Sequence, residues 1–158
     1  MSCAPTNRLL ATLLNMNPHG SLGKIHPYIE ITTNDAANLL DGIVSANLGQ
    51  MRRSTMGATQ TYPILRGIQN GTVRYKRADR NEHWQTWDEL VAQLRDNGVA
   101  YGDCEDFAAA VASELVYAGI PARTYVYKSG PSLYHVVVKT DRWGFLDPAR
   151  DAGMEGNG

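Results

Sequence analysis

The strongest constraint in this sequence is the acidic tetrapeptide Asp103-Cys104-Glu105-Asp106, which lies between a short loop and an apolar helix. The alanine-, valine- and leucine-rich residues 107–118 predict that helix, and Gly119 ends it. A cysteine in the first turn of a helix meets exposed backbone N–H groups and the positive end of the peptide dipoles. Both favour the thiolate, which is the nucleophilic form of cysteine.

A histidine and an aspartate follow this cysteine in strand-like segments. His135 lies in the β-branched segment 133–138, and Asp147 lies at the end of 145–148. A thiol nucleophile needs a base that removes its proton and a carboxylate that orients the base. The order Cys104, His135, Asp147 therefore predicts a catalytic triad, although a lone cysteine is more often a small core residue.

The size and charge of the chain exclude some classes of partner. Its 158 residues are 43% hydrophobic and 20% charged, which is typical of a single globular domain with its own core. The 15 basic and 16 acidic residues give a formal net charge of −1. Because this charge creates no strong field, we expect neither nucleic acid nor a membrane surface as a partner.

The two cysteines, Cys3 and Cys104, are too few for a disulfide framework. They indicate a reducing compartment in which Cys104 stays a free thiol. The N-terminus lacks a basic segment before its short apolar segment 9–14, and no segment has the apolar length of a membrane span. We therefore expect a cytoplasmic location.

Periodicity and turn residues predict an α+β fold, in which a helix-rich first half precedes an antiparallel meander. The expected helices cover 6–16, 35–48, 87–95 and 107–118, with a helical turn over 63–68. The expected strands cover 24–32, 72–76, 122–128, 134–140 and 143–146. The polar segments 49–61 and 99–102 predict loops, the first of them mobile. We expect an N-terminal extension over 1–23, one domain over 24–148 and a flexible tail over 149–158.

The three acidic residues around Cys104 allow two roles. As caps, Asp103, Glu105 and Asp106 would satisfy free N–H groups of the first helical turn. As ligands, the same three would hold a calcium ion, although their spacing is not that of an EF-hand. In either role their charge opposes a thiolate, so His135 would have to outweigh them. The charged neighbours also predict that Cys104 does not lie in an apolar site.

Acyl transfer requires donors for the oxyanion that forms when a thiolate attacks a carbonyl. The backbone N–H of Cys104 is the first candidate. Gln85, Trp84 and Trp87 are candidates for the second, since an amide or an indole N–H can donate; each tryptophan could equally be a core residue. On its strand, His135 shares a face with Val137 and not with Val136.

At these residues the chain resembles the transglutaminase-like superfamily of papain-related cysteine enzymes. The motifs that carry the resemblance are Trp84-Gln85-Thr86-Trp87, Gly102-Asp103-Cys104-Glu105-Asp106, Gly119-Ile120-Pro121-Ala122, Tyr134-His135-Val136-Val137 and Leu146-Asp147-Pro148. The resemblance implies a papain/transglutaminase-like fold, with the nucleophile helix packed on an antiparallel sheet. It also implies Cys104 as nucleophile, His135 as base and acid, and Asp147 as orienter.

The segments 29–48 and 129–137 are similar to small members of this superfamily that bacteriophages encode, which would place the protein in the host cytoplasm. Three functions stay open. The chain could be a peptidase or amidase, a transglutaminase or deamidase, or a non-catalytic interaction module on this fold. We expect a protein or peptide substrate and no required cofactor. The resemblance makes calcium a candidate ion, because some relatives bind calcium through acidic residues beside the nucleophile.

Overall fold

The structure, a computed structural model, describes residues 33–54, 62–77, 83–131 and 133–155. The elements within these residues are helices α2 (Thr33–Arg53), α3 (Pro63–Asn70), α4 (Trp87–Asn97), α5 (Cys104–Tyr117) and α6 (Pro148–Asp151), and strands β1 (Val73–Tyr75), β2 (Ala100–Gly102), β3 (Ala122–Gly130), β4 (Leu133–Thr140) and β5 (Gly144–Leu146). The predicted α+β class is confirmed.

The strands form two separate sheets. Strands β3, β4 and β5 make an antiparallel meander in that order, as predicted. Strands β1 and β2 form a parallel pair, with Val73 opposite Ala100. Residues 99–102 were expected to be loop, and that prediction is wrong over β2. A three-residue strand carries too little pattern to be recognised before its partner is known.

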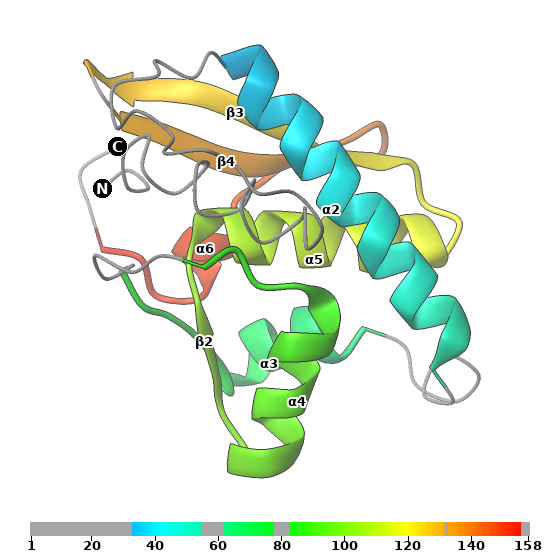
Figure 1. Cartoon of the computed structure of the whole chain (residues 1–158). Helices are drawn as coiled ribbons and strands as arrows, with labels where there is room; N and C mark the ends of the chain where they lie inside the picture. The colour runs from blue at the N-terminus through cyan, green and yellow to red at the C-terminus, as the bar shows by residue number, and fades with distance from the viewer. Residues whose placement is uncertain (1–32, 55–61, 78–82, 132, 156–158) are drawn as a thin grey trace, which may run out of the picture.

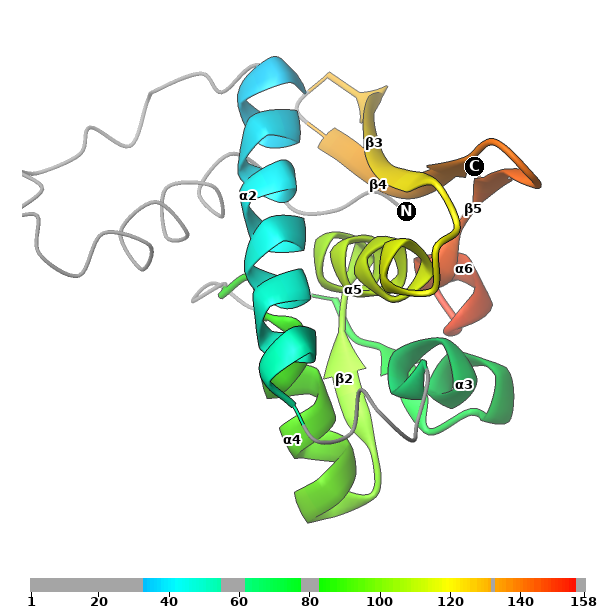
Figure 2. The same cartoon turned by 90° about the vertical axis from the view of Figure 1, so that its right-hand side faces the viewer.

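Helix α5 lies at the centre of the molecule. Figures 1 and 2 show it between the β3–β5 sheet on one side and helices α3 and α4 on the other, while α2 crosses the side of all these layers. Helix α5 packs against α2, β3, β4 and α6. The nucleophile-candidate helix therefore does pack on the antiparallel sheet.

The composition of α5 explains its central place. Every residue from Cys104 to Leu115 is buried, because apolar side chains lie on all sides of the helix and protein N–H groups bind its acids Asp106 and Glu114. Its own Phe107 and Val111 belong to one core with Leu40 of α2 and Leu90 of α4. From the sheet side, Val136 and Val138 of β4 belong to the same core.

Helix α2 is longer than the sequence predicted. It continues past the expected end at 48 to Arg53, and both Asn47 and Met51 are buried on its inner face. The prediction of a mobile loop over 49–61 is therefore wrong over 49–53. Gly49 and the polar residues around it suggested a break, but the burial of Met51 extends the apolar stripe by another turn.

The ends of α3 and α4 follow the predicted turn residues. Each helix ends at a glycine with positive φ, Gly71 at 80° and Gly98 at 73°. The left-handed conformation at these positions is available to glycine without steric cost. The predicted boundaries at Asn70-Gly71 and Asn97-Gly98 are therefore confirmed.

The segment after Pro148 is not the flexible tail that the sequence predicted. Residues 148–151 form helix α6, and both Ala149 and Met154 are buried in the core. The N–H of Tyr75 in β1 donates to the carbonyl of Ala152 at 2.8 Å. Two apolar side chains in a polar, glycine-rich segment are enough to dock it.

Several predictions lie outside the described residues: the extension over 1–23, the helix over 6–16, the strand over 24–32, the rest of the loop over 55–61, and residues 156–158. Within the described ranges, no helix combines the length and hydropathy that crossing a membrane requires.

Candidate active site

The candidate nucleophile is the first residue of helix α5. Asp103 is the N-cap, in extended conformation, and its N–H donates to Oδ2 of Asp106 at 3.1 Å. This is one half of a capping box, which holds the helix start in a fixed geometry. The predicted capping role of the acidic tetrapeptide is thus confirmed for Asp106.

Cys104 itself is fully buried within the hydrophobic core, and its acidic neighbours Asp103, Glu105 and Asp106 are buried with it. The expectation that charged neighbours keep this cysteine out of an apolar site is wrong. The carboxylate of Asp106 can be buried because three backbone and side-chain N–H groups donate to it. These hydrogen bonds replace those that water would make.

The structure assigns Cys104 to a disulfide and not to a free thiol, contrary to prediction. The sequence contains one other cysteine, Cys3, which lies outside the described residues. A sulfur in a disulfide has no proton to lose and does not attack a carbonyl. Any nucleophilic role of Cys104 therefore belongs to the reduced protein.

Glu105 is the acidic residue closest to the sulfur. Its Oε2 lies 3.1 Å from Sγ of Cys104, and the side chain is buried. In the reduced protein a carboxylate at this distance accepts the S–H hydrogen bond, and it repels the thiolate. Glu105 thus favours the resting thiol over the reactive form.

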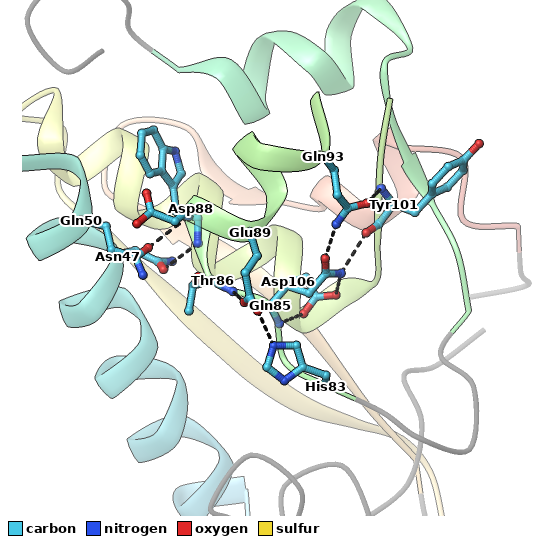
Figure 3. A network of polar contacts seen from close by, with 11 residues as sticks. Asn47, Gln50, His83, Gln85, Thr86, Asp88, Glu89, Gln93, Tyr101 and Asp106 are labelled. Carbon is cyan, nitrogen blue, oxygen red and sulfur yellow. Dashed lines mark hydrogen bonds and ion pairs between the residues drawn. The ribbon is translucent and has the colours of Figure 1, made fainter. Parts of the chain in front are cut away.

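A network of polar contacts fixes the loop 83–86 against the start of α5 (Figure 3). The backbone N–H of Gln85 donates to Oδ1 of Asp106 at 2.8 Å, and its side-chain Nε2 donates to Oδ2 at 3.0 Å and to the carbonyl of Tyr101 at 2.8 Å. Its Oε1 accepts from Gln93. Because both Nε2 hydrogens are engaged, Gln85 positions the loop and does not supply the second oxyanion donor.

The two tryptophans of the Trp-Gln-Thr-Trp motif have different roles. Nε1 of Trp87 donates to Oε1 of Glu114 at 3.0 Å, so Trp87 is a core residue with a satisfied indole. Trp84 is also buried, but within the described part of the chain its Nε1 has no hydrogen-bond partner. Of the three predicted donors, only Trp84 has an N–H to give.

His135 and Asp147 form the pair that the sequence predicted. Nε2 of His135 lies 2.8 Å from Oδ2 of Asp147, and the imidazole is almost completely buried. Oδ1 of Asp147 accepts the N–H of Arg150 at 3.2 Å, so the same carboxylate caps helix α6. Burial acts to raise the pKa of Asp147, but the hydrogen bonds from His135 and Arg150 outweigh it and leave this pKa below its usual value.

His135 shares a face of β4 with Val137, as predicted, but the β4 residues that belong to the core with α5, Val136 and Val138, lie on the opposite face. His135 stands opposite Tyr127 in the register of β3 and β4, and Val137 stands opposite Tyr125. The rings of His135 and Tyr127 pack edge to face, with centroids 5.5 Å apart. Burial, and next the negative charge of Asp147, raise the pKa of Tyr127, so its phenol stays protonated.

The elements that carry the three triad candidates are in contact, since α5 packs against both β4 and α6. Among the hydrogen bonds of the described residues, none joins Cys104 to His135. The structure thus brings the candidate base His135 and the candidate orienter Asp147 together, and helix α5 as a whole packs against the elements that carry them. The thiol–imidazole contact is part of the proposal below.

The acidic tetrapeptide does not form a metal site in this structure. The described residues contain no group of three or more histidine, cysteine or acidic side chains that could hold a metal ion. Asp106 directs its two oxygens at N–H donors, and Glu105 lies against the Cys104 sulfur. These arrangements do not fit the calcium role, which required Asp103, Glu105 and Asp106 to converge.

One buried acid, Glu114 in the middle of α5, was not among the residues predicted from the sequence. Its Oε1 accepts from the backbone of Ile64 and its Oε2 from that of Leu65, both at 2.9 Å, in addition to the Trp87 bond. Burial raises the pKa of Glu114 to about 7, against the opposing effect of these hydrogen bonds. A charged residue in an otherwise apolar helix is the signal that could have identified it.

Fold and site together define an α+β protein in which a helix that begins with cysteine packs on an antiparallel sheet, and in which the buried His135 of that sheet pairs with the half-buried Asp147 at the start of α6. No protein-family model, curated protein or solved structure matches the chain significantly.

Proposed function

We propose that this chain, in its reduced form, is a cysteine-dependent hydrolase of transglutaminase-like type that cleaves a peptide or amide bond. The observation that carries the proposal is the 2.8 Å contact between His135 and Asp147, on elements packed around the helix that begins with Cys104. A buried imidazole held by a carboxylate has a fixed ring orientation, which is what a general base requires.

The reaction would proceed in two stages. His135 takes the proton of the Cys104 thiol, and the thiolate attacks the amide carbonyl carbon. When the C–N bond breaks, the amine leaves with the proton from His135, and a thioester remains on Cys104. His135 then takes a proton from water, which attacks the thioester and releases the carboxylic acid and the thiol.

Asp147 supports both stages by binding Nε2 of His135, which directs the other ring nitrogen, Nδ1, to the proton transfer. The N–H of Cys104 and the indole N–H of Trp84 would bind the oxyanion. The support for Trp84 is that its buried N–H has no hydrogen-bond partner among the described residues. An unsatisfied buried donor costs free energy unless a ligand or transition state engages it.

The test is reaction of the reduced protein with iodoacetamide, followed by mass spectrometry of each cysteine. In a Cys3→Ser background, His135→Ala should slow labelling of Cys104 by about tenfold or more, because a general base contributes at least that much. His83→Ala is the matched control, since His83 is an exposed histidine bound to Glu89. If the two variants react equally fast, the hydrolase proposal fails.

Two alternatives give different results. A transglutaminase would incorporate a fluorescent primary amine into a glutamine-bearing protein, because the amine replaces water in resolving the thioester. A non-catalytic module would show His135-independent labelling and no turnover of either kind. The burial of Cys104 and its 3.1 Å approach to Glu105 are the observations that favour this last alternative.

A further inference from the structure

An aromatic ladder covers the outer face of the β3–β5 sheet beside the His135–Asp147 pair. Phe145 of β5 packs edge to face on Tyr125 of β3, with centroids 5.2 Å apart. Tyr125 lies 6.5 Å from Tyr127, and Tyr127 lies 5.5 Å from His135. The ladder thus runs without a break from the edge strand to the candidate base.

These aromatic side chains are unusually open to solvent. Phe145 is 58% exposed, Tyr127 41% and Tyr125 39%. A group of large aromatic side chains exposed on one sheet face is typical of an interaction surface, because a folded protein normally buries such side chains in its core. Exposure of these rings to water is unfavourable in free energy, and a ligand that covers them removes this unfavourable exposure.

A cavity of about 500 Å³ opens over the ladder. The residues lining it are Tyr125, Tyr127, Val137, Phe145, Leu146 and Asp147. Its volume lies within the range of pockets that bind ligands. Because Asp147 both lines the cavity and binds Nε2 of His135, the cavity is continuous with the candidate catalytic pair.

The charges around the cavity decide what it can bind. The carboxylate of Asp147 already binds His135 and lies 4.0 Å from Nε of Arg150. Nζ of Lys139 lies 5.7 Å from the ring centre of Phe145, and Arg123 stands opposite Lys139 in the register. A cationic side chain would meet this basic rim, and the carboxylate that lines the cavity, Asp147, is already bound to His135.

From these observations we infer that the cavity is a specificity subsite for an uncharged aromatic side chain of a peptide substrate. The ring would stack on Tyr125 and Phe145, while the peptide bond to be cleaved would lie towards His135. This inference rests on the proposed hydrolase function and names the class of substrate that the function would take.

The test compares peptides that carry the same electrophile and differ at one neighbouring residue, which is phenylalanine, lysine or aspartate. In the reduced Cys3→Ser protein, the phenylalanine peptide should label Cys104 about tenfold faster or more, as burial of an aromatic ring implies. Phe145→Ala and Tyr125→Ala should each remove most of this preference and leave the rate with iodoacetamide unchanged. Tyr117→Ala, an exposed tyrosine at the end of α5, is the matched control.

Failure of the subsite and failure of the hydrolase give different patterns. Equal rates for the three peptides, with labelling that depends on His135, would overturn the subsite alone; so would fastest labelling by the lysine peptide. Labelling independent of His135 would overturn the hydrolase. In that case, binding of a fluorescent phenylalanine peptide to a Cys104→Ser variant tests the cavity directly, and no loss of binding in Phe145→Ala would overturn it.

Discussion

The carboxylate of Asp147 joins two parts of the structure: Oδ2 lies 2.8 Å from Nε2 of His135, and Oδ1 accepts the backbone N–H of Arg150. One side chain therefore orients the candidate base and starts helix α6. The two roles can be separated, because a cap needs only an acceptor oxygen, whereas the imidazolium needs a negative charge.

Asp147→Asn should keep the cap and lose the charge. We expect labelling of Cys104 in the reduced protein to slow by about tenfold or more, with an unfolding free energy within about 1 kcal/mol of the original. Asp147→Ala should lose both, with a further destabilisation of about 1 kcal/mol. Thiol labelling and urea unfolding measure the two effects. Unchanged labelling in Asp147→Asn would contradict the orienting role.

Glu105→Gln should increase the reactivity of Cys104. The variant removes a negative charge 3.1 Å from the sulfur, and with it the repulsion that opposes the thiolate. At neutral pH we expect the reduced protein to react with iodoacetamide about tenfold faster, which corresponds to about 1.4 kcal/mol. Glu89→Gln, a change of an exposed glutamate that pairs with His83, is the control. A slower reaction would mean that Glu105 activates the sulfur.

The protein should lose stability as the pH rises from about 4.5 to 7. The pKa of Glu114 is raised from 4.5 to about 7, so between these values the folded state keeps a proton that the unfolded chain has released. Its contribution is complete below pH 4.5 and is lost as the pH rises to 7, by about 3 kcal/mol.

The measurement is urea unfolding at several pH values for the original chain and for Glu114→Gln. The difference in unfolding free energy between the two should change between pH 4.5 and 7 and be constant above 7. Glu89→Gln, at an exposed position, provides a background without this change. A constant difference across the whole range would show that Glu114 stays ionised in the folded protein.

Gly102→Ala should destabilise the start of α5. A Cβ at this position would lie 2.8 Å from Cε1 of Phe107 and 3.0 Å from Oδ2 of Asp106, closer than van der Waals contact allows. We expect a loss of about 1–3 kcal/mol in thermal or urea unfolding. Gly49→Ala in helix α2 is the matched change, and it should stabilise by about 0.5–1 kcal/mol because only the flexible Arg53 approaches it. Equal effects would show that Phe107 moves aside.

The elements that sequence analysis found are those whose signal is local. The positions of α4, α5 and the β3–β5 meander follow from periodicity and from turn glycines such as Gly98. The elements that it missed depend on distant partners. Strand β2 exists because it pairs with β1, and α6 is held by the burial of Ala149 and by the bond from Tyr75 to Ala152.

The same distinction applies to the site. The pairing of His135 with Asp147 was predictable from their order in the sequence, with His135 on one strand and Asp147 at the end of the next. The engagement of Gln85 by Asp106 and Tyr101 was not, because it depends on how the loop 83–86 lies across the start of α5. The approach of Glu105 to the sulfur is likewise a matter of side-chain geometry that sequence spacing leaves open.

The anchoring of residues 149–154 has a practical consequence for engineering. Met154 fills part of the core, and the carbonyl of Ala152 accepts the N–H of Tyr75 in β1. The segment 149–154 is therefore held against the β1–β2 pair. Truncation after Pro148 would expose that core and leave the N–H of Tyr75 without its acceptor. An affinity tag or fusion partner should therefore be joined after Glu155, and deletion of the preceding residues should produce aggregation.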